Sequence, residues 1–270
     1  MNPNQALWEK GDFTRIAESM RTSGETLVED LGAIEGLDVL DLGCGDGTTA
    51  LPEARRGANV LGVDIARNLV EAGNKRAADE GLSNLRFQQG DASALDELGD
   101  DSFDLVVSIF GAMFAPRPLD VANEMVRVTR AGGRIVMGNW IPGDPTLVAQ
   151  ILKISSAYSP PPPEGFVSPM LWGVVDEVVA RFTAAGVEAN KITCEPKTFV
   201  FEAPVSPTEY LKSFRDYYGP TMNAFEAANS NGRGDALFEE LDVLFNAQNA
   251  NGSTGSTSIP ATYLRVTVSV

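Results

Sequence analysis

Three acidic residues and a glycine-rich turn are the groups in this sequence with the clearest chemical meaning. The segment Asp41-Leu42-Gly43-Cys44-Gly45-Asp46-Gly47 places a carboxylate just before three glycines, and further carboxylates follow at Asp64 and Asp91. Glycines in such a turn leave backbone N–H groups open to a ligand. Carboxylates accept hydrogen bonds from ribose hydroxyls and attract cations. The spacing therefore predicts a site for an adenosine ligand that carries positive charge.

The identity of this ligand depends on the charges around the glycines. A pyrophosphate site of the G-x-G-x-x-G type requires glycine where Thr48 stands, and Asp41 and Asp46 would repel phosphates. S-adenosylmethionine carries an ammonium and a sulfonium but no phosphate, so the same carboxylates would attract it. We therefore predict S-adenosylmethionine as the cofactor and S-adenosylhomocysteine as its product.

The composition excludes several kinds of chemistry. The 270 residues include no histidine, which rules out Ser-His-Asp and Cys-His catalysis and HExxH zinc sites, and we predict no metal. The 37 acidic and 21 basic residues give a net charge of −16. Because nucleic acids and anionic membranes are bound mainly through Lys and Arg, this excess of acid argues against either partner.

Cysteine usage and hydropathy indicate where the protein resides. Cys44 and Cys194 are too far apart for a zinc knuckle or a redox pair, and we expect Cys44 to be a small buried residue rather than a nucleophile. Residues 1–10 lack the basic and apolar regions of a secretory signal, and no run of eighteen uncharged apolar residues occurs. These features predict a cytoplasmic protein.

Short apolar runs alternate with segments of helical period over the first half of the chain. Strands are predicted at 37–42, 59–64, 85–89, 103–109 and 134–140, with helices at 48–56, 66–80 and 118–128 between them. This alternation is typical of a parallel sheet covered by helices on both faces. In such a sheet, ligands bind beyond the carboxyl ends of the strands, which is where the acidic residues lie.

The regular alternation stops after Trp140. Prolines at 142, 145 and 160–163 predict an irregular excursion, followed by a helix at 172–185 and a strand at 191–201. A helical insert is expected over 206–248, then a flexible loop and a last strand at 261–270. The predicted organisation is a helical cap over 1–36, a core over 37–203 and 259–270, and a helical insert over 204–258 that forms part of a lid.

The order of these motifs resembles a known family. Residues 39–47 are similar to the first motif of class I S-adenosylmethionine-dependent methyltransferases, and 62–65, 90–92, 103–107 and 127–134 are similar to its later motifs. Within that family the resemblance is to bacterial small-molecule methyltransferases of the quinone-biosynthesis type. It implies an α/β, Rossmann-like sheet of seven strands, of which five to six are parallel and the last is antiparallel.

The resemblance also implies a role for individual residues. Asp41 and the backbone at Gly43–Gly45 would hold the methionine part, Asp64 would bind the ribose, and Ile65 would cover one face of the adenine. Asp91 would accept a hydrogen bond from the adenine amino group. The full implied cofactor set is Asp41, Gly43, Cys44, Gly45, Asp64, Ile65, Asn68, Gly90, Asp91, Ala92, Ser108 and Ile109.

The methyl acceptor is expected where aromatic residues gather. The N-terminal segment, the end of the fourth strand, the region after Trp140 and the insert are rich in aromatic side chains, which suit a flat or apolar acceptor. The candidate acceptor residues are Phe13, Phe110, Met113, Phe114, Trp140, Trp172, Tyr217 and Tyr218. No residue is assigned as a general base, although Asp144 and Tyr217 are of a suitable type.

These features together predict an enzyme that transfers a methyl group from S-adenosylmethionine to a small or medium-sized organic acceptor by in-line displacement. The protein would be a monomer or a homodimer. Two alternatives remain open. One is a non-catalytic protein that binds S-adenosylmethionine and acts through a partner, and the other is a nicotinamide-dependent oxidoreductase on a similar sheet.

Overall fold

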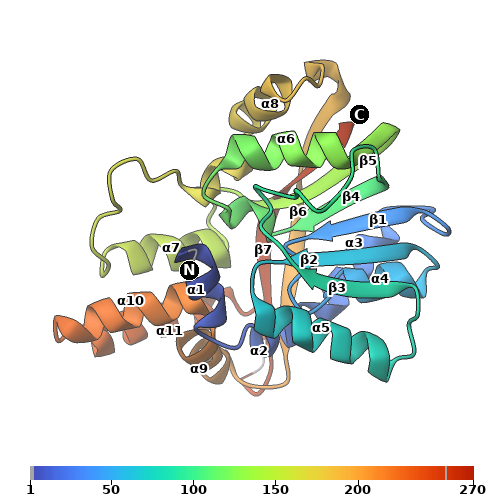
Figure 1. Cartoon of the computed structure of the whole chain (residues 1–270). Helices are drawn as coiled ribbons and strands as arrows, with labels where there is room; N and C mark the ends of the chain where they lie inside the picture. The colour runs from blue at the N-terminus through green and yellow to red at the C-terminus, as the bar shows by residue number, and fades with distance from the viewer. Residues whose placement is uncertain (1–2, 253) are drawn as a thin grey trace.

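A twisted seven-stranded sheet runs through the protein (Figure 1), whose computed structural model describes residues 3–252 and 254–270. The strand order is β3-β2-β1-β4-β5-β7-β6. The strands from β1 to β5 pair in parallel, and β7 is antiparallel to both β5 and β6. The predicted Rossmann-like sheet with an antiparallel last strand is confirmed. The strands are β1 (Asp38–Leu42), β2 (Asn59–Asp64), β3 (Leu85–Gln89), β4 (Phe103–Ile109), β5 (Thr129–Trp140), β6 (Ile192–Ala203) and β7 (Thr257–Ser269).

The central strands are buried on both faces because helices cover each side of the sheet. Successive side chains of a strand point to opposite faces. Accordingly, Val39 and Leu105 belong to one apolar cluster, and their neighbours Leu40 and Val106 belong to the other. Both clusters are continuous across β1 and β4, so these two strands are rigid supports for the loops at their carboxyl ends.

The helices lie on both faces and at the carboxyl ends of the strands (Figure 1). Short 3₁₀ helices also occur among the described residues: η1 (Glu18–Met20), η2 (Ala112–Phe114), η3 (Pro169–Gly173) and η4 (Ala189–Lys191). The α-helices are α1 (Pro3–Glu9), α2 (Thr14–Ala17), α3 (Arg21–Glu29), α4 (Ala50–Arg55), α5 (Arg67–Asp79), α6 (Pro118–Val128), α7 (Leu147–Ser156), α8 (Val175–Ala184), α9 (Pro207–Tyr217), α10 (Gly219–Ser230) and α11 (Gly234–Gln248).

The region after β5 differs from the prediction. An irregular excursion was expected there, but α7 forms a ten-residue helix that buries Leu147 and Ile151. Pro145 precedes the helix and so does not interrupt its hydrogen bonds. The next helix, α8, begins at Val175 rather than at 172 because the residues before it form the 3₁₀ turn η3.

Helices α9, α10 and α11 fill the connection between β6 and β7. Ser206 caps α9, since its side chain accepts a hydrogen bond from the N–H of Glu209, as the sequence predicts. Tyr218 separates α9 from α10, and the close approach of Gly219, the first residue of α10, to the carbonyl of Leu7 brings α10 against α1. In the described part of the chain, no helix has the length and apolar character needed to cross a membrane.

Candidate functional site

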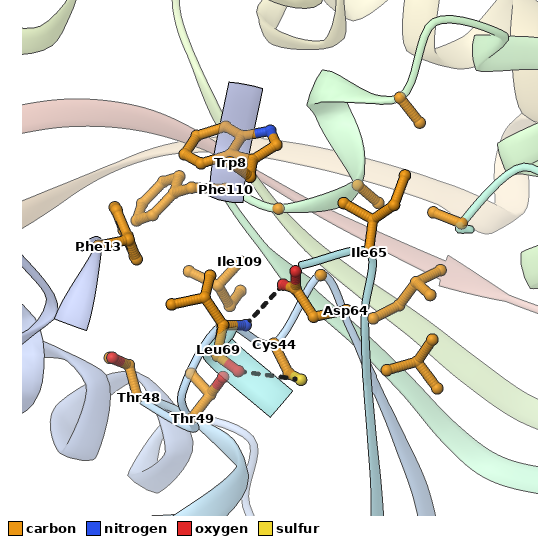
Figure 2. Close-up of a pocket in the computed structure, with 18 of the residues that line it drawn as sticks. Trp8, Phe13, Cys44, Thr48, Thr49, Asp64, Ile65, Leu69, Ile109 and Phe110 are labelled. Carbon is orange, nitrogen blue, oxygen red and sulfur yellow. Dashed lines mark hydrogen bonds between the residues drawn. The ribbon is translucent and has the colours of Figure 1, made fainter. Parts of the chain in front are cut away.

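A cavity of about 870 Å³ lies at the carboxyl ends of β1, β2 and β4 (Figure 2). Its floor is the glycine-rich turn after β1, where Gly43, Gly45 and Gly47 all have positive φ. A side chain at such a position is strained, so glycine allows this turn to remain tight. We refer to this space as the first cavity.

The backbone of the turn is tied to the end of β2. The carboxylate of Asp64 accepts a hydrogen bond through one oxygen from Gly45 N–H at 2.8 Å, drawn as the dashed line to Asp64 in Figure 2. Its other oxygen accepts from Ala66 N–H at 2.9 Å. Each oxygen retains a second lone pair. Asp64 lines the cavity while being 9% exposed, and burial raises its pKa. It can therefore orient the turn and still accept hydroxyl groups from a ligand.

Asp41 lies beneath the turn and does not line the first cavity. Its Oδ2 accepts a hydrogen bond from the hydroxyl of Thr49 at 2.6 Å, and Oδ1 has no hydrogen-bond partner among the described residues. Burial, with the nearby negative charge of Asp64, raises the pKa of Asp41 to about 7 although the Thr49 hydrogen bond opposes this. A cationic ligand above the turn would favour the ionised form of this carboxyl.

Two further acids surround Asp41 and behave differently. Glu53 on α4 is fully buried, both its carboxyl oxygens lack a partner in the described structure, and burial together with Asp41 raises its pKa well above the usual range. Asp46 is also buried but forms an ion pair with Arg21 at 2.5 Å. Arg76 donates to the backbone carbonyl of Asp46 at 2.6 Å. The negative charge of Asp46 is thus balanced by arginine, whereas Asp41 and Glu53 have no such ion pair among the described residues.

The carboxyl end of β3 contributes a second polar wall. Gly90, Asp91 and Ala92 line the first cavity, and Asp91 Oδ1 accepts hydrogen bonds from the N–H and the hydroxyl of Ser93. Ile65 and Leu69 provide apolar surface beside them (Figure 2). A carboxylate beside apolar side chains can bind the edge and the face of a purine.

Residues near the N-terminus cover the first cavity. Asn4, Trp8 and Phe13 line it, and the two labelled rings lie opposite the glycine turn in Figure 2. A Cβ on Gly45 would come within 3.8 Å of the Phe13 ring. The sequence indicated that the aromatic N-terminal segment from Trp8 onward could cover the cofactor, but Asn4 was not expected at the site and Trp8 was not among the individual candidate residues.

A second cavity of about 490 Å³ adjoins the first and is almost entirely apolar. The two cavities share Trp8, Phe13, Met20 and Phe110. Phe110 has φ +60°, which is unusual for a bulky residue and is found mainly where function requires it. This conformation stacks its ring on Trp140, with 3.6 Å between ring centroids. The remaining residues that line the second cavity are Ile16, Phe114, Trp140, Val148, Ile151, Leu152, Phe201, Phe214 and Tyr218.

Comparisons with known proteins agree with this geometry. A family model described as a methyltransferase domain matches residues 40–137. The chain is 33% identical over 242 residues to an uncharacterized protein of Mycobacterium tuberculosis, covering 88% of this chain and 84% of that protein. It is also 35% identical over 134 residues to a demethylmenaquinone methyltransferase of Renibacterium salmoninarum, covering 48% of this chain and 54% of that protein.

A solved structure has a similar fold. It is phosphoethanolamine N-methyltransferase 2 of Haemonchus contortus in complex with S-adenosyl-L-methionine, with a TM-score of 0.57 and 15% identity over 92% of this chain and 52% of that one. The chain belongs to the class I S-adenosylmethionine-dependent methyltransferases. S-adenosylmethionine is the cofactor of this methyltransferase.

Nine of the twelve residues that the sequence suggested for cofactor binding line the first cavity of the methyltransferase. The other three do not line it: Asp41 lies under the turn, Asn68 is on α5, and Ser108 donates its hydroxyl to the carbonyl of Leu42 at 2.6 Å and accepts from Ala112 N–H. Those that line the cavity are Gly43, Cys44, Gly45, Asp64, Ile65, Gly90, Asp91, Ala92 and Ile109. Cys44 is buried as expected, and burial raises the pKa of its thiol, which keeps it protonated.

The candidate acceptor residues of the methyltransferase divide into two groups. Phe13, Phe110, Phe114, Trp140 and Tyr218 line the second cavity. The other three line neither cavity. Met113 is buried in the core, Trp172 packs on Phe182 and Arg181, and Tyr217 is 39% exposed at the end of α9. The suggested base Asp144 instead accepts hydrogen bonds from Thr146 at the start of α7.

Proposed function

We propose that this methyltransferase transfers the methyl group of S-adenosylmethionine to a small or medium-sized organic acceptor by in-line displacement. The observation that carries the proposal is the junction of the two cavities at Trp8, Phe13, Met20 and Phe110. A cavity whose lining includes carboxylates and the backbone of the glycine turn suits the cofactor. An adjoining apolar cavity suits a second reactant, so the two would meet at the shared wall.

The polar groups of the first cavity match the parts of the cofactor. Asp64 has lone pairs available for the ribose hydroxyls, and Asp91 with Ala92 would bind the edge of the adenine. The carboxyl of Asp41, with its unpartnered oxygen below the turn, would favour the ammonium and sulfonium charges. This arrangement would direct the methyl group towards the shared wall.

Alignment would supply much of the rate enhancement. The methyl carbon of a sulfonium is already activated, and holding an acceptor atom in line with the C–S bond lowers the barrier without a metal or a histidine. Displacement forms the new bond to the methyl carbon while the electron pair of the C–S bond goes to sulfur. The apolar surroundings would exclude water from this exchange.

Calorimetric titration of the purified protein tests the cofactor site first. S-adenosylmethionine, S-adenosylhomocysteine and NAD are titrated in parallel, and we expect binding of the first two only. Production of S-adenosylhomocysteine with an acceptor then tests transfer. Binding of NAD alone, or of none of the three, would refute the proposal, whereas tight cofactor binding without turnover of any acceptor class would favour a non-catalytic binding protein.

A further inference from the structure

The second cavity contains almost no group that could bind a charge. Among the thirteen residues that line it there is no Asp, Glu, Lys or Arg. Its polar groups are the indole N–H groups of Trp8 and Trp140 and the hydroxyl of Tyr218, beside the thioether of Met20. Burying an unpaired charge in such a space is strongly unfavourable, because no group there replaces the water that solvates it. A charged or strongly polar acceptor would therefore not enter it.

The walls of this cavity are flat. Phe110 and Trp140 are stacked with an interplanar angle of 9°, and Trp140 and Phe201 are stacked with an angle of 29°. Trp8 and Tyr218, which also line the cavity, meet edge to face with 5.8 Å between ring centroids. Aromatic rings gain most from contact with other rings, in offset or edge-to-face arrangements. The shape and the chemistry of the lining both favour a planar ring over a flexible chain.

One oxygen in this lining is available to a ligand. The hydroxyl of Tyr218, which lies between α9 and α10, forms no hydrogen bond with any residue that the structure describes, while the hydroxyl of Tyr210 on α9 is paired with Ser19 at 2.6 Å. Burial raises the pKa of Tyr218, so its phenol stays protonated at neutral pH and acts as a donor rather than as a base. A ligand oxygen inside the second cavity could accept this hydrogen bond.

We propose that the acceptor is a planar, uncharged, mainly apolar molecule bearing a phenol or enol hydroxyl, and that Tyr218 donates a hydrogen bond to the oxygen that is methylated. The inference rests on the proposed methyl transfer and names its substrate class. The acceptor oxygen bonds to the methyl carbon, the C–S electron pair goes to sulfur, and the hydroxyl proton passes to solvent water as the product leaves the cavity. The products are the methyl ether and S-adenosylhomocysteine.

Equilibrium dialysis against the protein saturated with S-adenosylhomocysteine tests the substrate class. The probes are 2-naphthol, naphthalene, naphthalene-2-sulfonate, 1-decanol and 2-aminoethanol. We expect 2-naphthol to bind most tightly, naphthalene next, and the sulfonate and the aminoalcohol at least about tenfold more weakly than naphthalene. Tighter binding of decanol would overturn the planar class, and tighter binding of a charged probe would overturn the apolar class.

Substitution of Tyr218 tests its hydrogen bond. Tyr218→Phe should weaken 2-naphthol binding by about fivefold, the value of one net hydrogen bond, and change naphthalene binding by less than about twofold. Tyr217→Phe is the matched control, because Tyr217 is the neighbouring tyrosine and lies outside both cavities. An equal effect of Tyr218→Phe on both probes, or no effect, would refute the donor role.

A charge placed in the lining gives an independent test. Leu152→Asp on α7 should weaken naphthalene binding by at least about tenfold. Ser156→Asp, which adds the same charge on an exposed turn of that helix, should not. Calorimetry with S-adenosylmethionine is run on each variant. If the unmodified protein does not bind the cofactor, the proposed function itself is refuted. If it binds the cofactor but neither 2-naphthol nor naphthalene, only the acceptor class is refuted.

Discussion

The backbones of Gly43 and Gly111 are in direct contact, so that a Cβ built on Gly111 would lie only 2.2 Å from the carbonyl oxygen of Gly43. The contact joins the turn after β1 to the loop after β4. Ser108 supports the same junction from below through its hydrogen bonds to Leu42 and Ala112. The two loops at the base of the first cavity therefore have a fixed separation.

Gly111→Ala should disrupt this junction. The φ of Gly111 is −94°, which alanine readily adopts, so the effect would come from the clash with Gly43 alone. We expect a loss of about 1–3 kcal/mol of unfolding free energy, as for other overpacked sites, with weakened cofactor binding. Urea denaturation and calorimetry measure both. Gly81→Ala, at an open position, should reduce stability by about 1 kcal/mol with unchanged cofactor affinity.

Asp64→Ala should weaken S-adenosylmethionine binding by at least about tenfold, because it removes the acceptor proposed for the ribose and releases the N–H of Gly45. Calorimetric titration measures the change. Glu71→Ala, an exposed acid on α5, is the control for lost negative charge. Unchanged affinity in Asp64→Ala would mean that the ribose lies elsewhere.

The buried acids predict that stability depends on pH. Burial raises the pKa of Asp41 to about 7 and that of Glu53 well above its usual range. Between the unfolded and folded pKa values the folded protein binds more protons, so its stability is greatest at low pH within that window and falls as the pH rises from about 4 to about 7.

Glu53→Gln should remove part of this loss. The amide cannot ionise, so the free energy of unfolding of the variant should fall less between pH 5 and pH 8 than that of the unmodified protein. We expect the two decreases to differ by at least about 1 kcal/mol. Urea midpoints at the two pH values measure the difference. Glu71→Gln on the surface serves as a comparison and should show no such gain. Equal pH dependence in the Glu53 variant and the unmodified protein would show that Glu53 does not titrate in this way.

A hydrogen bond fastens the N-terminal segment that carries Trp8 to the sheet domain. Glu9 Oε1 accepts from the N–H of Arg67, at the start of α5, at 3.0 Å and from Gln5 at 2.9 Å. These hydrogen bonds lower the pKa of Glu9, so the carboxylate remains ionised in mildly acidic solution. Lys10 holds the same segment to α10 through Glu226 at 2.7 Å.

Glu9→Ala should therefore release the cofactor more rapidly. We expect the dissociation rate of S-adenosylhomocysteine in stopped-flow measurements to increase by about threefold or more, since the substitution removes a hydrogen bond that fastens the segment to α5. The melting temperature should change little. Glu18→Ala, an exposed acid in the following 3₁₀ turn, should dissociate at the rate of the unmodified protein. Equal rates in the two variants would argue against a closing role for Glu9.

The sequence predicted correctly those elements whose limits depend on neighbouring residues in the chain. The strand at Phe103–Ile109 and the helix at Pro118–Val128 have their predicted limits, because β-branched runs and a proline at the first helical turn act locally. The acids and glycines at the strand ends were found because parallel strands bring their carboxyl ends to one edge. Helix α7 was missed because the prolines on both sides of it indicated an irregular segment, although its apolar residues have helical spacing.

The rest of the site depends on contacts between distant segments. Trp8 meets Phe114 at 5.0 Å and Tyr218 at 5.8 Å between ring centroids, and no periodicity links these three residues. Composition alone also could not separate the aromatic residues that line a cavity from those that do not. Trp172, for instance, packs under Arg181 at 4.6 Å from its ring centroid, away from both cavities.

The place of β7 in the sheet bears on how the protein is made. This strand is synthesised after every other strand, yet it lies between β5 and β6 and pairs with both along most of its length. Until it leaves the ribosome, β6 has no neighbour in the sheet, and the helices α9 to α11 are tethered at one end only. The glycine turn and β1 to β5 can pair earlier, because all their partners precede them in the chain. The nascent chain would thus complete its nucleoside-binding edge first and close its aromatic pocket last.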